Sequence, residues 1–156
     1  VSGDTVVYGN QWEIINDAYT GAVYIIEKDS SGTWNETRIS PPELQDGAQF
    51  ASSIDIDGDV IVVGAPDDRG TNGTAYIFRR TETVWVQEAS IGSEDSDTEN
   101  FGDSIIVQGD TIFVADNLYG ANETKIGAVF VYQYERPSNV WKLKETITNT
   151  GCESRF

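Results

Sequence analysis

The sequence contains no histidine and a single cysteine, Cys152. Without an imidazole the chain has no Ser-His-Asp or Cys-His pair, no histidine-ligated zinc and no general base with an ordinary pKa near neutrality. One cysteine cannot form an internal disulfide or a thiolate cluster. Cys152 is therefore interpreted as a buried or incidental thiol, with pairing to a cysteine outside the segment as the alternative. These absences predict a protein that is not an enzyme.

Positive charge is scarce too. Ten Lys and Arg residues face 26 Asp and Glu residues, which leaves a net charge of −16 and an isoelectric point near 4.1. Such a surface repels phosphate backbones and anionic lipids. The sequence also lacks an apolar run of about 18 residues and the basic and apolar regions of a signal peptide. We expect no nucleic-acid partner and no direct membrane insertion in this segment.

What the sequence does contain is a repeat with a period near 50 residues. Hydrophobic residues make up 38% of the chain, enough for a packed core. Three landmarks recur at separations of 51 to 56 residues, and they are Gly3/Gly58/Gly109, Tyr24/Tyr76/Phe130 and Trp34/Trp85/Trp141. We predict one copy at 1–48 that lacks its first strand, copies at 49–99 and 100–154, and the start of a fourth at 155–156. We therefore expect the segment to begin and end within a repeat and to be part of a longer array.

Each copy shows only β patterns. Gly58-Asp59 lies between two runs rich in Val and Ile, which is typical of a hairpin whose turn needs a positive φ. Two further strands follow in each copy, the second carrying the recurrent tryptophan. No window has apolar residues at helical spacing, so no helix is expected. The prediction is an all-β protein built of β-propeller blades, each with four antiparallel strands. About three blades make an incomplete ring.

Short motifs within the copies resemble the FG-GAP repeat. Phe101-Gly102 supplies the FG, Gly64-Ala65-Pro66 supplies the GAP, and Phe50-Ala51 is a near match. Copies one and three depart from the pattern, with Gly9-Asn10-Gln11 and Ala115-Asp116-Asn117 in place of GAP. The FG-GAP repeat is the blade unit of integrin α-subunit propellers and of many secreted proteins. The resemblance implies a propeller, commonly of seven blades, that works outside the cell or at its surface in adhesion or ligand binding.

An aspartate cluster in copy two raises the question of calcium. Asp55, Asp57 and Asp59 form the sequence D-I-D-G-D, and Ca²⁺ takes several oxygen ligands from loops that contain a glycine. However, Asp55 and Asp57 alternate with isoleucines, which indicates a half-exposed strand. A structural turn is the preferred interpretation and calcium the alternative. No other cofactor is expected.

Several loop residues are candidates for binding a partner. The acidic segment 93–100 is interpreted as a solvated linker, with loose cation binding as the alternative. The recurrent tryptophans are interpreted as packing between blades, against the alternative of a carbohydrate platform. Loops carry function more often than strands do, and loop-borne aromatics can anchor partners. The candidates for ligand binding are Trp12, Asp67, Asp68 and Tyr119.

Three N-x-T sequons begin at Asn35, Asn72 and Asn122. If the chain passes through a eukaryotic secretory pathway, these asparagines are candidate glycosylation sites.

Three functions remain open on the sequence alone. The leading hypothesis is a non-catalytic extracellular module whose loops bind protein or glycan partners. The alternative is a structural subunit of an extracellular filament, sheath or coat, assembled through further repeats of the same chain or of neighbouring subunits. An enzyme or its accessory domain ranks third, because the acidic residues fall in turns and linkers and not in one pocket.

Overall fold

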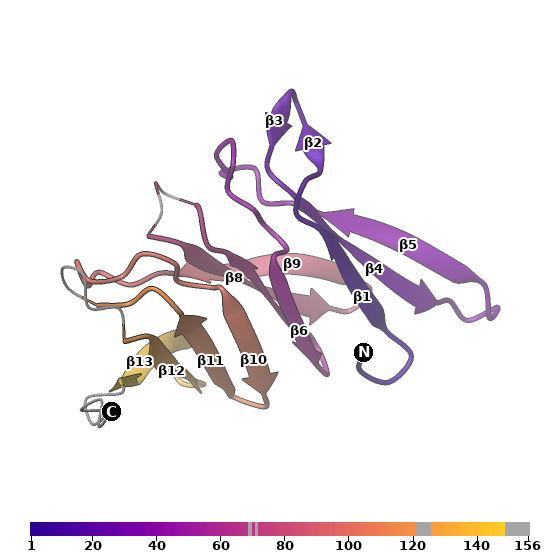
Figure 1. Cartoon of the computed structure of the whole chain (residues 1–156). Coiled ribbons are helices and arrows are strands. Elements are labelled where there is room, and N and C mark those ends of the chain that lie inside the picture. Colours follow the sequence, from indigo (N-terminus) through magenta and orange to yellow (C-terminus); the bar gives the residue numbers. More distant parts are fainter. Residues whose placement is uncertain (69, 71, 121–125, 149–156) are drawn as a thin grey trace, which may run out of the picture.

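The computed structural model describes residues 1–68, 70, 72–120 and 126–148. Within these ranges the chain forms only β-strands, turns and bends, as the sequence predicts (Figure 1). None of the described residues belongs to a helix long and apolar enough to cross a membrane. The strands are, in chain order, β1 (Val6–Asn10), β2 (Ile14–Ile15), β3 (Ala18–Tyr19), β4 (Ala22–Lys28), β5 (Trp34–Ile39), β6 (Ser53–Asp57), β7 (Val60–Ala65), β8 (Thr74–Thr81), β9 (Val84–Ile91), β10 (Ser104–Gln108), β11 (Thr111–Asp116), β12 (Ala128–Glu135) and β13 (Val140–Thr148).

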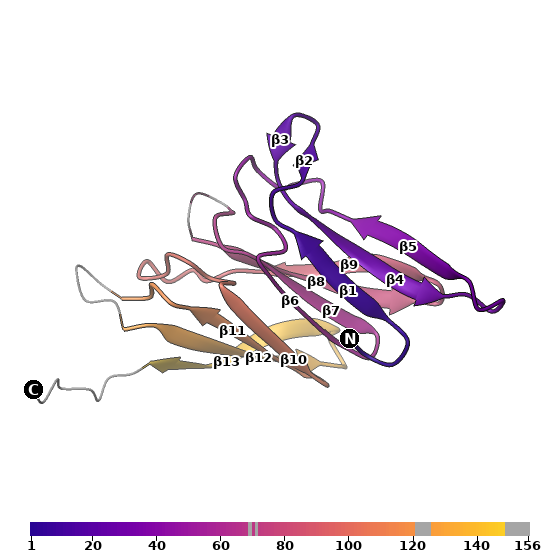
Figure 2. The same ribbon diagram turned by 45° about the vertical axis from the view of Figure 1, so that its right-hand side comes forward.

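The strands form three antiparallel sheets that follow one another along the chain. The first sheet has the order β1-β4-β5, the second β6-β7-β8-β9 and the third β10-β11-β12-β13. We call them blades one, two and three. Blades two and three each have the four antiparallel strands of a propeller blade, so the predicted fold class is confirmed. The short hairpin β2-β3 is a separate unit that projects from blade one (Figures 1 and 2).

Two-residue turns join the first pair of strands in blades two and three. Asp57 pairs with Val60, which leaves Gly58 and Asp59 as the loop. Gly58 has a φ of 56° and Gly109 a φ of 57°. A glycine with positive φ at the first loop position suits the right-handed twist of a hairpin. The predicted Gly-Asp hairpin turns are therefore present.

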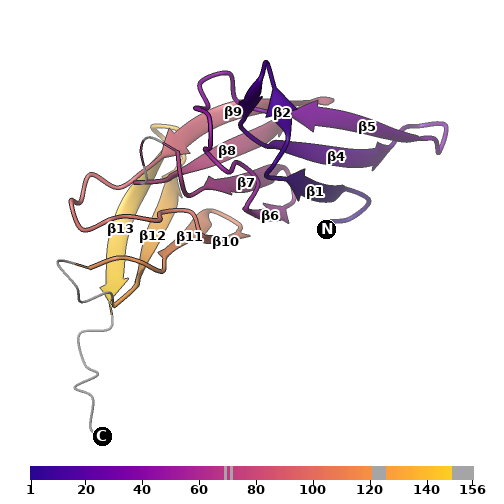
Figure 3. The same cartoon turned by 45° about the horizontal axis from the view of Figure 1, so that its top comes forward.

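Apolar side chains fill the two spaces between successive blades. One buried cluster joins Val23 and Ile25 of blade one to Phe50, Tyr76 and other residues of blade two. A second cluster joins Val62 and Ile77 of blade two to Phe101 and Phe130 of blade three. The blades stand side by side, with β1, β6 and β10 along one edge and β5, β9 and β13 along the other (Figure 3). The core of this protein thus lies between sheets.

Polar contacts between the first strands fix the register of the blades. The Gly58 N–H donates to Ser2 Oγ at 3.0 Å, and the Gly109 N–H donates to Asp57 Oδ2 at 2.7 Å. Each bond joins the turn glycine of one blade to the residue just before the turn glycine of the preceding blade. In addition, Asp55 Oδ2 accepts from the Val107 N–H at 2.8 Å.

A glycine allows the backbones of blades two and three to approach closely. A Cβ atom placed on Gly64 would lie 2.0 Å from the carbonyl oxygen of Gly102. Gly9 of blade one has a similar position, since its Cβ would lie 2.6 Å from Ala51 Cβ. In blade three the same place is taken by Ala115, which pairs with Ser104 as Gly64 pairs with Ser53.

Candidate functional site

The hairpin β2-β3 projects from blade one, and both of its turn residues are exposed. Its turn residues Asn16 and Asp17 have φ values of 52° and 65°, and after glycine Asn and Asp are the residues that adopt such values at the smallest cost. Ile14 pairs with Tyr19 and Ile15 pairs with Ala18. Because side chains alternate across a strand, the two pairs face opposite sides of the hairpin.

Glu13 holds the base of this hairpin. Its backbone carbonyl accepts from the N–H groups of Thr20 and Gly21, each at 3.1 Å. Its carboxylate accepts from Asn10 Nδ2 at 2.7 Å and from the Tyr24 hydroxyl at 2.9 Å. The bond to Glu13 is also the largest cause of a raised pKa at Tyr24. Hydrogen bonds therefore join the open end of the hairpin to β1 and β4.

The segment that leads from blade one to blade two holds the other side of the hairpin. The Tyr19 N–H donates to Asp46 Oδ1 at 2.8 Å, and the Gly47 N–H donates to the Tyr19 carbonyl at 2.8 Å. The Phe50 N–H then donates to the Thr20 carbonyl at 3.0 Å. Backbone bonds on both sides keep the hairpin in one position.

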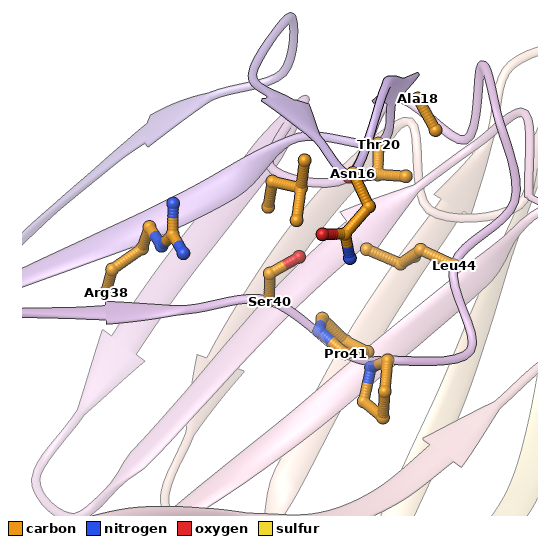
Figure 4. A pocket seen from close by; sticks show the side chains of 9 residues that line it. Asn16, Ala18, Thr20, Arg38, Ser40, Pro41 and Leu44 are labelled. Carbon is orange, nitrogen blue, oxygen red and sulfur yellow. The ribbon is translucent and has the colours of Figure 1, made fainter.

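A pocket of about 390 Å³ lies between the hairpin and this segment. Its volume falls within the range of roughly 300–1,000 Å³ that is typical of small-molecule sites. The Asn16 amide group hangs over the pocket opposite Ser40 and Leu44, and Arg38 stands at one side (Figure 4). The lining residues are Ile15, Asn16, Ala18, Thr20, Arg38, Ser40, Pro41, Pro42 and Leu44.

Thr20 is an unusual member of this lining. The residue is only 7% exposed, and its Oγ1 atom makes no hydrogen bond with any residue that the structure describes. A buried hydroxyl without a partner costs free energy, because it has lost its bonds to water. Ser40, by comparison, donates its hydroxyl to the Gly21 carbonyl at 3.1 Å.

Large apolar side chains are exposed on the outer face of the hairpin and on the turn before it. Trp12 is 60% exposed, Ile14 is 55% exposed and Tyr19 is 52% exposed. We call these three residues the hairpin patch. The Trp12 backbone N–H donates to Asn10 Oδ1 at 3.2 Å, which places Trp12 in an Asx-type turn. Of the four residues that the sequence suggested for ligand binding, only Trp12 lies here.

The other three suggested residues make contacts inside the protein. Asp68 is buried, and its Oδ2 accepts from the Tyr76 hydroxyl at 2.7 Å. Asp67 accepts from the Gln49 side chain. Tyr119 packs edge-on against Phe130, with ring centroids 5.8 Å apart.

Tyr119 also ties its loop to the acidic linker. Its hydroxyl donates to Asp95 Oδ2 at 2.7 Å, and this bond raises the Tyr119 pKa to about 12. The Gly120 N–H donates to the Asp97 carbonyl at 3.0 Å. Within the described residues, the acidic linker is therefore bonded to a neighbouring loop of blade three.

The aspartate cluster is spread over separate contacts. Asp55 and Asp57 accept backbone N–H groups of blade three, and Asp59 Oδ1 lies 3.4 Å from Arg80 Nε. No group of three or more His, Cys, Asp or Glu side chains that could hold a metal occurs in the part of the chain that the structure describes. These contacts give the two strand aspartates a structural task at the blade junction.

The three recurrent tryptophans differ in burial. Trp141 is 8% exposed, and its Nε1 donates to Glu88 Oε1 of blade two at 3.2 Å. Trp85 is half-buried against the cluster between blades one and two. Trp34 is 52% exposed, with Lys28 Nζ 4.7 Å from its ring centroid. Packing between blades is confirmed for Trp141 and Trp85, whereas Trp34 contacts no other blade within the described residues, and its packing stays a prediction.

Two of the sequon asparagines lie at the surface. Asn35 is exposed on β5, the outer strand of blade one, and its Nδ2 donates to Asp29 Oδ2 at 3.0 Å. Asn72 is exposed in the loop that precedes β8. Asn122 and Cys152 lie outside the described residues.

Comparison with known proteins supports the repeat. A search of curated proteins gave no match. Residues 34–78 match the model of the FG-GAP repeat, and this stretch runs from β5 of blade one into β8 of blade two. The motif Gly64-Ala65-Pro66 and the buried Phe50 both lie inside it. The chain therefore carries an FG-GAP repeat, set within consecutive sheets that have the form of propeller blades.

Proposed function

We propose that this chain is a non-catalytic, extracellular FG-GAP propeller module that binds a protein or glycan partner. The binding surface is the loop end of blade one, that is, the hairpin β2-β3 and the turn before it. The hairpin patch is the observation that carries the proposal. Trp12, Ile14 and Tyr19 are exposed together on the hairpin β2-β3 and the turn before it, and no such hairpin occurs among the described residues of blades two and three. Aromatic residues on a firmly held loop are the usual anchors of protein and glycan recognition.

Other features support a location outside the cell. FG-GAP repeats are typical of extracellular and cell-surface proteins, and residues 34–78 match this repeat. The sequons at Asn35 and Asn72 lie on exposed backbone. The net charge of −16 favours solubility and disfavours contact with anionic surfaces.

The test is binding of the full chain to immobilised matrix proteins and glycans, with Trp12→Ala and Tyr19→Ala as variants. We expect each variant to weaken binding to the selected partner at least tenfold, or about 1.4 kcal/mol. Trp34→Ala is the matched control, because Trp34 is equally exposed but lies on β5, away from the hairpin. Equal binding by wild type and both hairpin variants would contradict the proposal.

A second candidate is a structural subunit that assembles through its blades. Its support comes from the two end blades, whose outer faces expose large apolar residues. Tyr8 and Trp34 are exposed on blade one, and Ile106 and Ile147 are exposed on blade three. Apolar faces of this kind favour association of blades or of subunits.

A further inference from the structure

The outer face of blade three repeats the apolar face that blade two buries against blade three. Val62 of β7 pairs with Ile77 of β8, and both side chains are fully buried in the cluster between these blades. At the same positions of blade three, Phe113 of β11 pairs with Val131 of β12, but both are only half-buried. The apolar residues of this outer face are Ile106, Phe113, Val129, Val131 and Ile147.

The outer face of blade one repeats the face that blade two presents to blade one. Val63 of β7 pairs with Tyr76 of β8, and both are fully buried in the cluster between blades one and two. Tyr8 pairs with Tyr24 at the same positions of blade one, where the two rings stack with centroids 5.0 Å apart. The strand partner of Trp34 lies four residues after Tyr24 on β4, so Trp34 is on the same face.

A hydrogen bond between turns joins each pair of blades, and its two halves recur unpaired on the outer blades. The Gly109 N–H donates to Asp57, the residue just before the turn glycine of blade two, and blades one and two are joined in the same way. The turn glycine of blade one is Gly3, whose N–H has no partner among the described residues. The residue before the turn glycine of blade three is Gln108, which is exposed and whose side-chain oxygen is an acceptor. Blade one thus has a spare donor, and blade three has a spare acceptor at the matching position.

We propose that blade three of one chain binds blade one of a second copy, outer face against outer face, in the register of the two junctions within the chain. The Gly3 N–H of one copy donates to the Gln108 side-chain oxygen of the other. Tyr8 and Trp34 then cover the apolar residues of blade three. The inference rests on the second candidate function, to which it adds the partner, the two faces and their register.

A second copy is the occupant that these faces fit. Blades one and three stand at opposite ends of the row of blades, so both faces are open to another chain (Figure 3). The donor lies on one face and the acceptor on the other, so two like faces cannot form the bond between turns, and the contact is head-to-tail. Two copies joined at both faces bring together three described blades each, or six, within the range of about four to eight for closed propellers.

The test is sedimentation velocity of the full chain at about 0.15 M salt, which screens the repulsion between acidic chains. Trp34→Glu places a carboxylate on the outer face of blade one, and Ile106→Glu places one on that of blade three. Both side chains are exposed, at 52% and 59%, so neither change enters the core. We expect wild type to self-associate, and each variant alone to associate about tenfold more weakly, because a carboxylate buried without a partner is costly.

A mixture of the two variants is the decisive measurement. Trp34→Glu keeps an intact blade three and Ile106→Glu keeps an intact blade one. We therefore expect the mixture to form a one-to-one complex that neither variant forms alone. Val84→Glu is the control, because Val84 is 56% exposed on the middle blade, and this variant should associate as the wild type does.

The register has a test of its own in Gln108→Leu. Leucine adds apolar surface to the outer face of blade three but removes the acceptor for the Gly3 N–H. We expect this variant to associate several-fold more weakly than wild type. A contact that depends on apolar surface alone would become equal or stronger, and that result would overturn the proposed register.

The proposal is overturned if wild type stays a monomer at every concentration, if the mixture associates no more than its separate components, or if Val84→Glu lowers association as much as the other variants do. Self-association that persists in one variant alone, without complementation, would keep assembly but remove the head-to-tail contact. Melting temperatures equal to wild type show that the variants are folded. Binding of a partner that is lost with Trp12→Ala concerns the hairpin patch and is measured separately.

Discussion

At Gly64 a single hydrogen atom faces the carbonyl oxygen of Gly102 across the junction of blades two and three. A methyl group in that place would lie 2.0 Å from the oxygen and 2.4 Å from Ser53 Oγ. The nearest obstacle is backbone, which cannot rotate away as a flexible side chain can. One glycine therefore sets how closely the two sheets pack.

We predict that Gly64→Ala destabilises the protein by about 2–3 kcal/mol, because overpacked interiors must shift side chains or backbone. The measurement is urea unfolding followed by tryptophan fluorescence. Gly92→Ala is the control, since its Cβ would lie 3.5 Å from the nearest atom, the Gly73 carbonyl oxygen, which is an ordinary contact. If both variants unfold at the same urea concentration, the close approach does not matter for stability.

At the scale of an element, the hairpin between β4 and β5 is organised around one carboxylate. Asp29 Oδ1 accepts from the backbone N–H groups of Ser31 and Thr33 at 2.8 and 3.0 Å. The Ser31 hydroxyl and the Asn35 amide donate to the same carboxylate. These bonds, with that of the Ser31 hydroxyl the strongest, lower the Asp29 pKa from 3.8 to about 2.

A lowered pKa in the folded state means that folding favours the ionised form. The stabilising contribution of Asp29 is therefore complete above the unfolded pKa and disappears as the pH falls through about 2. We predict that wild type is more stable than Asp29→Asn at pH 6 and that this difference shrinks toward pH 2. The measurement is the melting temperature of both proteins across that range. As a control, Ser31→Ala should raise the Asp29 pKa in a carboxyl NMR titration, and an unchanged pKa would contradict this account.

Elements with a strong local signal were predictable. Gly58-Asp59 between two runs of Val and Ile gave the turn from sequence alone, because a two-residue hairpin depends on its own residues. The hairpin β2-β3 was not predicted, since its strands of two residues each are too short to show a period. Asn16-Asp17 was the signal that could have found it.

The pocket had no comparable signal. Its lining comes from two stretches, 15–20 and 38–44, that the fold brings together. No local pattern marks Thr20 as buried without a partner. The exposure of Trp34 within the described residues could not be predicted from the sequence either. The repeat makes the three tryptophans look equivalent, whereas the burial of each depends on the blade that precedes it.

At the scale of the whole molecule, the outer faces of blades one and three differ from the faces between blades in how far their apolar side chains are buried. The inner faces are closed by two buried clusters and by bonds such as Gly109 N–H to Asp57. Within the part of the chain that the structure describes, the outer faces of blades one and three expose apolar side chains, notably Trp34 and Ile147. Apolar surface of this kind is what association buries.

If the chain is a subunit of a larger assembly, sedimentation velocity should show self-association that grows with concentration. We then expect Trp34→Glu and Ile147→Glu each to reduce the associated fraction several-fold. Val84→Glu is the control, because Val84 is also exposed but belongs to the middle blade. A monomer at every concentration, or equal loss with Val84→Glu, would remove assembly through the outer faces of blades one and three.

Ala115 has a consequence for how freely the repeats could be rearranged. Its position in blade three is equivalent to that of Gly64 in blade two and Gly9 in blade one, where the absence of a side chain lets the following blade approach closely. Ala115 has a methyl group at this position. In an engineered chain in which a second copy of blade three replaces blade two, that methyl would meet the carbonyl oxygen of Gly102. The three blades are therefore not interchangeable modules, and one methyl group is enough to make their order matter.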